Sequence, residues 1–396
     1  MNDCNLSRRR FLQWTGAGAF AALSSQLTFE DLAVAASNSP LPAGTPILVV
    51  VTLYGGNDGL NTIVPFNDAV YLGKRANIAL ASSQLLPLNN ALAFNSSMPE
   101  IQALYNQNKV AIVQGVGYPG PNLSHFTSMA IWQTASVSTS ISSGWLGRWL
   151  DTQSHSPFNA IGVGSVLPPV LVGAKSVASM LPLSGLRAPA GIGSTLLARL
   201  GSPSSSDVHL EAAAATSISD LFSTAQVLGP LVTSSPSGSY LHEQLSLVST
   251  LIGAGVPTRV WEVNLSSFDT HVGEQADQNA LLAEVSAAIG NFMKSVGATS
   301  RANDVTVLMY SEFGRRVASN AGLGTDHGTA GPVFVVGNAV KGGLYGEQPS
   351  LSALDANGNL FMSTDFRDVY AGLLHDVLAT PASDVIDSWT TSLSLH

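Results

Sequence analysis

The chain has 396 residues, of which 45% are hydrophobic and only 11% are charged, and its formal net charge at pH 7 is −9. So acidic a chain offers no basic face to a phosphate backbone, which argues against a nucleic-acid partner. Its length is sufficient for one large hydrophobic core or two modest ones.

The first 36 residues resemble an export signal. Residues 7–13 read SRRRFLQ, similar to the twin-arginine pattern S/T-R-R-x-F-L-K. A mildly apolar stretch and small residues follow, so we expect passage through the twin-arginine translocase and cleavage near Ala35 or Ala36. The simpler alternative is a basic tail before a short helix. The apolar stretch is too short for a permanent membrane span, which predicts a periplasmic or secreted protein.

The only cysteine, Cys4, lies inside this predicted signal. The mature chain would therefore have no thiol and no disulfide, and any metal ion in it would be bound by histidine and carboxylate side chains.

Five apolar runs rich in β-branched residues predict strands that are covered on both faces. They are residues 46–54, 109–114, 259–265, 304–310 and 332–336. Helical periodicity lies between them, at residues 99–108, 127–134 and 276–294. This alternation predicts an α/β fold with a doubly wound, mainly parallel sheet and helices on both faces.

Residues from about 155 to 256 differ in composition, because Ser, Ala, Gly and Pro dominate there and charged residues are rare. This composition predicts an inserted, partly helical cap within a single domain that spans residues 37–396.

Polar and ionisable side chains lie next to the ends of the predicted strands. In an open α/β sheet, ligands bind beyond the carboxyl ends of the strands, so we expect these side chains to gather at one rim. They are Asp58 after the first strand, Ser124 and His125 after the second, Asp269 and His271 after the third, Glu312 and Arg315 after the fourth, and Asp326 and His327 before the fifth.

Carboxylates and imidazoles in this number suit divalent cations, which activate a nucleophile and stabilise a transferring phosphoryl or sulfuryl group. Each motif alone also has a structural interpretation. The GGNDG segment and Asp326 could form turns, the Ser-His pair could cap a helix, and Arg315 could form a surface salt bridge. The combination of all of them favours a metal site.

Six segments carry a family resemblance: VVVTLYGGNDGLNTIVP, GYPGPNLSHFTSMAIWQT, SSFDTHVGEQ, YSEFGRRVASN, GTDHGTAGPVFVVG and TDFRDVYAGLL. Block by block they resemble a large bacterial family that is exported by the twin-arginine route and catalogued as a domain of unknown function. That family in turn looks like a distant branch of the alkaline phosphatase and sulfatase superfamily, which implies an alkaline-phosphatase-like fold.

The superfamily pattern implies a role for each matching position. Asp58 matches the aspartate after the first strand, and Asp269 and His271 match an Asp/His pair, although the superfamily often spaces that pair wider. Glu312 stands at a second Asp-His pair, with Phe313 in place of its histidine.

His327 matches the last histidine of the pattern, which precedes a Pro-Val segment like the one here. Asp326 would be a ligand or an orienting partner. The resemblance implies two divalent ions, of zinc, manganese or calcium, and Arg315 would contact the oxyanion of the substrate.

The nucleophile is left open by the sequence. Ser124 lies at the start of a predicted helix, where backbone N–H groups favour an anion. If His125 matches the histidine that follows the nucleophile in some superfamily members, however, the nucleophile itself would fall near Pro121, which cannot serve. Thr62 and a metal-bound water are the other candidates.

The resemblance therefore implies an exported, metal-dependent hydrolase of phosphate or sulfate esters, acting on a small molecule or an envelope polymer. The alternative is a non-catalytic periplasmic or envelope binding protein derived from the same fold, because superfamily members that lose catalysis persist as binding modules.

Overall fold

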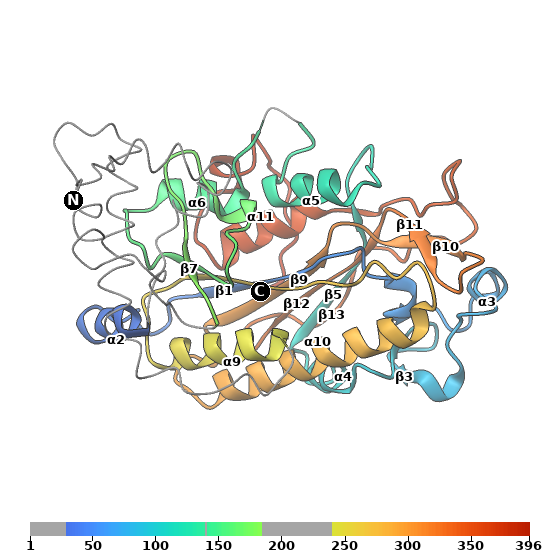
Figure 1. Ribbon diagram of the computed structural model, residues 1–396, viewed down its shortest axis with the longest axis horizontal. Helices are drawn as coiled ribbons and strands as arrows, with labels where there is room; N and C mark the ends of the chain where they lie inside the picture. The colour runs from blue at the N-terminus through green and yellow to red at the C-terminus, as the bar shows by residue number, and fades with distance from the viewer. Residues whose placement is uncertain (1–28, 139–140, 184–239) are drawn as a thin grey trace, which may run out of the picture.

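The computed structural model describes residues 29–138, 141–183 and 240–396 (Figure 1). A nine-stranded sheet forms its centre. Its strands are β1 (Ile47–Leu53), β5 (Val110–Gly117), β6 (Ala160–Val163), β7 (Ser179–Leu181), β8 (Val260–Leu265), β9 (Val305–Ser311), β12 (Gly331–Gly337), β13 (Gly343–Tyr345) and β14 (Thr364–Asp365).

The strands follow the order β13-β5-β12-β9-β1-β8-β6-β7, and β14 pairs with β5. Strand β12 runs antiparallel to both of its neighbours, β5 and β9. All other pairs in the sheet are parallel. The carboxyl ends of the parallel strands therefore meet the amino end of β12 at one rim.

Helices cover both faces of this sheet (Figure 1). One layer holds α4 (Pro99–Tyr105), α9 (Tyr240–Gly253) and α10 (Glu274–Gly297). The opposite layer holds α5 (His125–Thr134), α6 (Trp145–Thr152) and α11 (Phe366–Asp376).

The sheet separates the two larger clusters of the hydrophobic core. Val49 and Val51 of β1 face the cluster on the α9 and α10 side, whereas Leu48 and Val50 face the cluster on the α6 and α11 side. Because successive side chains of a strand point to opposite faces, a strand covered on both sides must be apolar throughout. This requirement explains the continuous apolar run at residues 47–51.

Smaller elements surround the sheet. They are the helices α2 (Phe29–Asn38) and α3 (Ala69–Lys74), a three-stranded sheet of β2 (Ile63–Val64), β4 (Ala93–Asn95) and β3 (Leu85–Pro87), a hairpin of β10 (Arg315–Ser319) and β11 (Thr325–His327), and the 3-10 helices η2 (Gly59–Asn61), η3 (Ser82–Gln84), η4 (Pro169–Leu171) and η5 (Ala382–Asp384).

The predicted fold class is confirmed. Each of the five apolar runs is a strand of the central sheet, namely β1, β5, β8, β9 and β12, and the three periodic segments are the helices α4, α5 and α10. The antiparallel direction of β12 is the one feature of this framework that departs from a parallel doubly wound sheet.

The parts of the predicted cap that the structure describes, residues 155–183 and 240–256, belong to the central sheet and its helix layers. Strands β6 and β7 extend the central sheet beyond β8, and α9 packs beside α10. Of the range 155–256, only residues 184–239 are left for a separate cap, and they lie outside the described residues.

Most of the predicted export signal, residues 1–28, lies outside the described residues. Helix α2 spans the expected cleavage point, and its Leu32 is buried in the core cluster on the α9 side. Within the described part of the chain, no helix is both long enough and apolar enough to cross a membrane.

Candidate metal centre

Four loops and one hairpin meet at the rim where the parallel strands end. The loops follow β1, β5, β8 and β9. The β10–β11 hairpin brings His327 to the same place, because β12 starts at this rim and runs away from it. Within the hairpin, His327 lies opposite Arg315.

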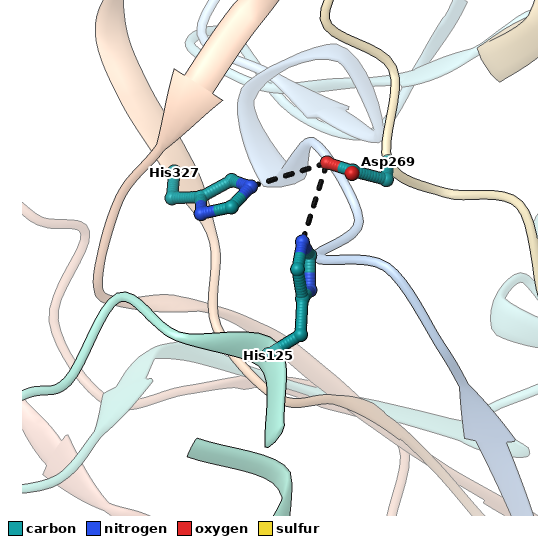
Figure 2. Close-up of side chains that lie close together, drawn as sticks. All are labelled: His125, Asp269 and His327. Carbon is teal, nitrogen blue, oxygen red and sulfur yellow. Dashed lines mark hydrogen bonds and ion pairs between the residues drawn. The ribbon is translucent and has the colours of Figure 1, made fainter. Parts of the chain in front are cut away.

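A cluster of His125, Asp269 and His327 forms at this rim (Figure 2). One ligand atom from each lies within 4.8 Å of the others. The Asp269 Oδ1 atom is 3.4 Å from His125 Nε2 and 3.2 Å from His327 Nε2. The three side chains come from three separate segments and point toward one another (Figure 2).

His271 adds a third imidazole to the same carboxylate oxygen. Its Nε2 atom is 3.0 Å from Asp269 Oδ1 and 3.0 Å from His327 Nε2. Four ligands about 2.0 to 2.2 Å from a tetrahedral zinc ion are separated from one another by roughly 3.3 Å. The three separations from Asp269 to the imidazoles, and the one between His271 and His327, are 3.0 to 3.4 Å and are therefore close to this value.

The tautomers of two histidines also fit a cation. His327 Nδ1 lies 2.8 Å from the Leu123 carbonyl oxygen, which can only accept, so Nδ1 carries the proton. His125 Nδ1 lies 2.8 Å from the Glu312 carboxylate, with the same consequence. In both rings the Nε2 lone pair then faces the cluster. His125 Nε2 is buried without a hydrogen-bond partner, as expected for a ligand atom.

Glu312 is held in place by its own hydrogen bonds. Its carboxylate accepts from the backbone N–H of Gly55 at 2.9 Å and from the Ser311 hydroxyl at 2.9 Å. Its backbone carbonyl accepts from the buried Ser128 hydroxyl on α5. These contacts join the loops after β1 and β9 to the helix that carries His125, and so fix the position of that imidazole.

Arg315 anchors the other side of the cluster. Its side chain is fully buried and donates to Asp269 Oδ1 at 2.8 Å. It also donates to backbone carbonyl oxygens of the loops around it, those of Gly55, Gly56, Phe268 and Thr325. In this arrangement Arg315 positions the carboxylate and joins three loops.

The charges in the cluster suit cation binding. Burial of Asp269 raises its pKa, but the hydrogen bond and the charge of Arg315 outweigh burial and lower the pKa to about 2. Burial lowers the pKa of His327, the contacts with the Leu123 carbonyl and Asp269 offset part of this decrease, and the neighbouring His125 and Arg315 lower the pKa further. The carboxylate is therefore ionised and the imidazole neutral at neutral pH.

Phe313 packs against two of these histidines, His125 and His327. Its ring centroid lies 4.9 Å from that of His125 and 4.9 Å from that of His327. Phe313, which occupies the position of a histidine in the superfamily pattern, thus contacts two imidazole rings.

Asp58 lies outside this cluster. Its carboxylate is fully buried and forms a two-pronged ion pair with Arg75, which is also fully buried. Burial raises the pKa of Asp58, but the charge of Arg75 outweighs burial and lowers it. Asp58 also caps η2 through the N–H of Leu60. Its contacts are those of a structural residue, and its role as a ligand stays a prediction.

Asp326 and Ser124 lie at the edge of the cluster. Asp326 is half exposed, and its Oδ1 atom lies 3.6 Å from His271 Nδ1, in the place of an orienting partner. Ser124 is exposed at the N-terminus of α5, and its side chain forms no cap hydrogen bond, so its hydroxyl is accessible. Thr62, by contrast, is buried, and its hydroxyl donates to the Asp58 carbonyl oxygen at 2.7 Å.

Two buried residues near the site were missed by the sequence reasoning. They are Arg75 and Glu274, at the first position of α10, and burial together with the nearby Asp58 raises the pKa of Glu274. Glu274 accepts from the Thr325 hydroxyl in the hairpin and from Asn61 in η2. In the segment LGKRANIAL, Arg75 directly follows Lys74, a pattern typical of a solvated face, so this segment carries no signal for the burial of Arg75.

Comparison with known proteins gives one family match. Residues 212–382 match the family described as "Protein of unknown function (DUF1501)". Four of the six segments that carry the sequence resemblance lie in this range. No curated protein matches the chain.

Solved structures show similarity at low identity. An alkaline phosphatase superfamily protein from Vibrio parahaemolyticus is 10% identical, with a TM-score of 0.40, over 90% of this chain and 77% of the other. The C-terminal periplasmic domain of EptC from Escherichia coli, in complex with Zn, is 10% identical, with a TM-score of 0.35, over 76% and 78%.

The lipoteichoic acid synthase LtaP from Listeria monocytogenes is 9% identical, with a TM-score of 0.34, over 91% of this chain and 80% of the other. At such identities and TM-scores, what these proteins bind or do is not transferable to this chain. The match to the DUF1501 model covers residues 212–382, which is less than half of the chain.

Proposed function

We propose that the protein is a metal-dependent hydrolase of phosphate or sulfate esters. The observation that carries this proposal is the convergence of three imidazole Nε2 atoms on one carboxylate oxygen at 3.0 to 3.4 Å. His125, His271, His327 and Asp269 would hold a divalent cation, of which zinc fits the donor set best. A second ion, with Glu312 or Asp326 among its ligands, is part of the proposal.

When bound, the cation would polarise the ester and offset the charge that develops in the transition state. The chain's own residues would do the rest. Arg315 holds the Asp269 carboxylate in place, and Glu312 holds the His125 ring. The first turn of α5 lines the same cleft as Asp269 and Glu312, and the backbone N–H groups at a helix start favour an anionic group.

Ser124 is the proposed nucleophile. It is accessible, lies next to His125 and starts the helix, whereas Thr62 is buried and its hydroxyl is engaged. Attack by water is the alternative.

The proposal is tested with the purified full chain. Elemental analysis is expected to find a divalent metal, and p-nitrophenyl phosphate or p-nitrophenyl sulfate is expected to be hydrolysed, with loss of turnover after chelation and recovery after metal is returned. Metal without turnover of either ester would contradict the hydrolase and favour the non-catalytic binding protein. Absence of metal would contradict the metal site on which the proposed hydrolase depends.

We also propose export through the twin-arginine translocase. Replacing Arg8 and Arg9 with lysine is expected to leave the precursor in the cytoplasm, as measured by fractionation and by the mass of the mature N-terminus. Replacing Lys74 and Lys109 with arginine serves as the control. Undiminished export of the Arg8/Arg9 variant would contradict the assignment.

A further inference from the structure

A large cleft opens beside the candidate metal centre. Its volume is about 1090 Å³, and it runs along α5 and the loops after β1 and β8. His125, Asp269 and Glu312 form part of its wall, so the cleft and the metal centre are continuous. Ligand pockets commonly measure about 300 to 1,000 Å³, so this cleft can hold much more than a phosphoryl or sulfuryl group.

Charged groups are confined to one end of the cleft. Among the described residues that line it, His125, Asp269 and Glu312 are the only acidic or basic side chains other than tyrosine. A second phosphate or a carboxylate placed farther along the cleft would be desolvated without a cation beside it, which is costly. The part of a ligand that extends away from the metal centre should therefore be uncharged.

The exposed surface of the cleft wall is mainly apolar. Phe126, the residue after His125, is 91% exposed, and Val137 is 46% exposed. Phe126 and Ala130 lie four residues apart and so share one face of α5. An isolated exposed apolar side chain needs no explanation, but here several adjoin a candidate catalytic centre.

Polar groups at the base of the cleft are partly paired with each other. The Gln133 side-chain amide donates to the Tyr54 hydroxyl at 3.0 Å. This contact engages one polar atom of each side chain. Apolar contact is then the main interaction that the cleft offers.

We propose that the cleft binds an alkyl or acyl chain, and that the substrate is a lipid-like ester whose phosphate or sulfate lies at the metal centre. This inference rests on the proposed function for the position of the ester group. The chain would lie along α5 and contact Phe126, Met129, Ile131 and Val137.

The test compares esters that differ only in chain length. The probes are ethyl and octyl phosphate and the matching sulfates, at concentrations below micelle formation. Each buried methylene favours binding by roughly fourfold, so six additional methylenes in an open cleft should raise kcat/KM at least ~10-fold. Isothermal titration calorimetry with the same compounds gives an independent measure of binding.

Three variants locate the effect. Phe126→Ser is expected to reduce the octyl-to-ethyl ratio several-fold, and Phe126→Leu to retain most of it, because leucine keeps the apolar contact. Leu72→Ser changes a 46% exposed apolar residue on α3, outside the cleft, and is expected to leave the ratio unchanged.

The outcomes separate this inference from the proposed function. Equal kcat/KM for ethyl and octyl esters would overturn the lipid-like substrate and leave the hydrolase standing. No turnover, but tighter binding of the octyl compound that Phe126→Ser abolishes, would overturn the hydrolase and support the apolar cleft. Neither turnover nor binding of any probe would overturn both.

Discussion

The Asp269 carboxylate is the residue on which the candidate site depends. A single oxygen, Oδ1, faces three imidazole nitrogens and the Arg315 guanidinium. Without a cation, one acceptor cannot satisfy several neutral rings whose lone pairs face it. A bound cation resolves this conflict, because each lone pair then has a partner.

His327→Ala is expected to lower metal affinity by more than ~100-fold, because loss of a direct ligand should cost more than loss of a residue that only orients one. Turnover should fall with metal content. Elemental analysis after dialysis measures the effect, and His375→Ala is the control, because the side chain of His375 is 81% exposed on α11. Undiminished metal content in the His327 variant would mean that the hairpin residue is only part of a turn.

Ser124→Ala should separate metal binding from catalysis. Its hydroxyl is not among the cluster ligands, so metal content should be unchanged. If Ser124 is the nucleophile, kcat should fall by several powers of ten. Retention of most activity, measured with p-nitrophenyl phosphate or sulfate, would instead assign the attack to water.

At the scale of elements, the β10–β11 hairpin controls the loop that carries Asp269 and His271. A Cβ atom at Gly324 would lie 2.3 to 2.6 Å from backbone atoms of His271 and Thr270. The hairpin and this loop therefore pack backbone against backbone.

Gly324→Ala is expected to displace His271 and weaken metal binding at least ~10-fold, since loss of support for a ligand typically costs 10- to 100-fold. Gly297→Ala is the matched control, because a Cβ there meets no atom within 4 Å. Metal titration of the two purified variants checks the result. Equal affinities would show that the loop adapts without cost.

The sequence predicted the central strands because a strand buried on both faces leaves a continuous apolar run. It did not predict β6 and β7, which have four and three residues and lie among Ser, Gly and Pro. It could not predict the direction of β12 either, because an apolar run looks the same in both directions. Residues 312–330, between β9 and β12, form the β10–β11 hairpin rather than a crossover helix, and β12 therefore returns antiparallel to β9.

The site was predicted in part. Asp269, His271 and His327 each adjoin a central strand, and in an open α/β sheet side chains beyond the carboxyl ends of the strands gather at one rim. The sequence therefore predicted that these three residues lie together. The sequence could not assign His125 to the metal ligands, since that depends on the Glu312 contact between segments 187 residues apart. It also could not separate Asp58 from the cluster, because the pairing with Arg75 depends on tertiary packing.

At the scale of the whole molecule, a buried acid in the sheet affects stability. Glu262 of β8 is fully buried, and its Oε2 atom has no hydrogen-bond partner. Burial raises its pKa from the ordinary value of 4.5 to about 8, although hydrogen bonds with Asn264 and Thr52 oppose this increase. At neutral pH the folded protein therefore keeps this group protonated.

A raised pKa in the folded state makes stability decrease as pH rises. Below pH 4.5 both states bind the proton. Between 4.5 and about 8 only the folded state keeps it, so the free energy of unfolding falls, and above 8 the full cost of a buried charge is present.

Glu262→Gln, which stays neutral, should remove this part of the pH dependence, on the order of a few kcal/mol between pH 5 and 9. Urea unfolding across that range measures it, with the exposed Glu347→Gln as the control. Parallel curves for the wild type and the Glu262 variant would contradict the assignment.

The position of β12 has a consequence for the order of events during synthesis. This strand lies between β5 and β9, and both of these precede it in the chain. Until residues 331–337 leave the ribosome, β5 cannot join the sheet that contains β9, because β12 is the strand that pairs with both. His125, on the helix after β5, is then still separated from Asp269. Contacts between such distant segments form late, because loop closure must precede them. The metal centre should therefore assemble only after synthesis is almost complete, and metal acquisition would act as a checkpoint for a finished chain.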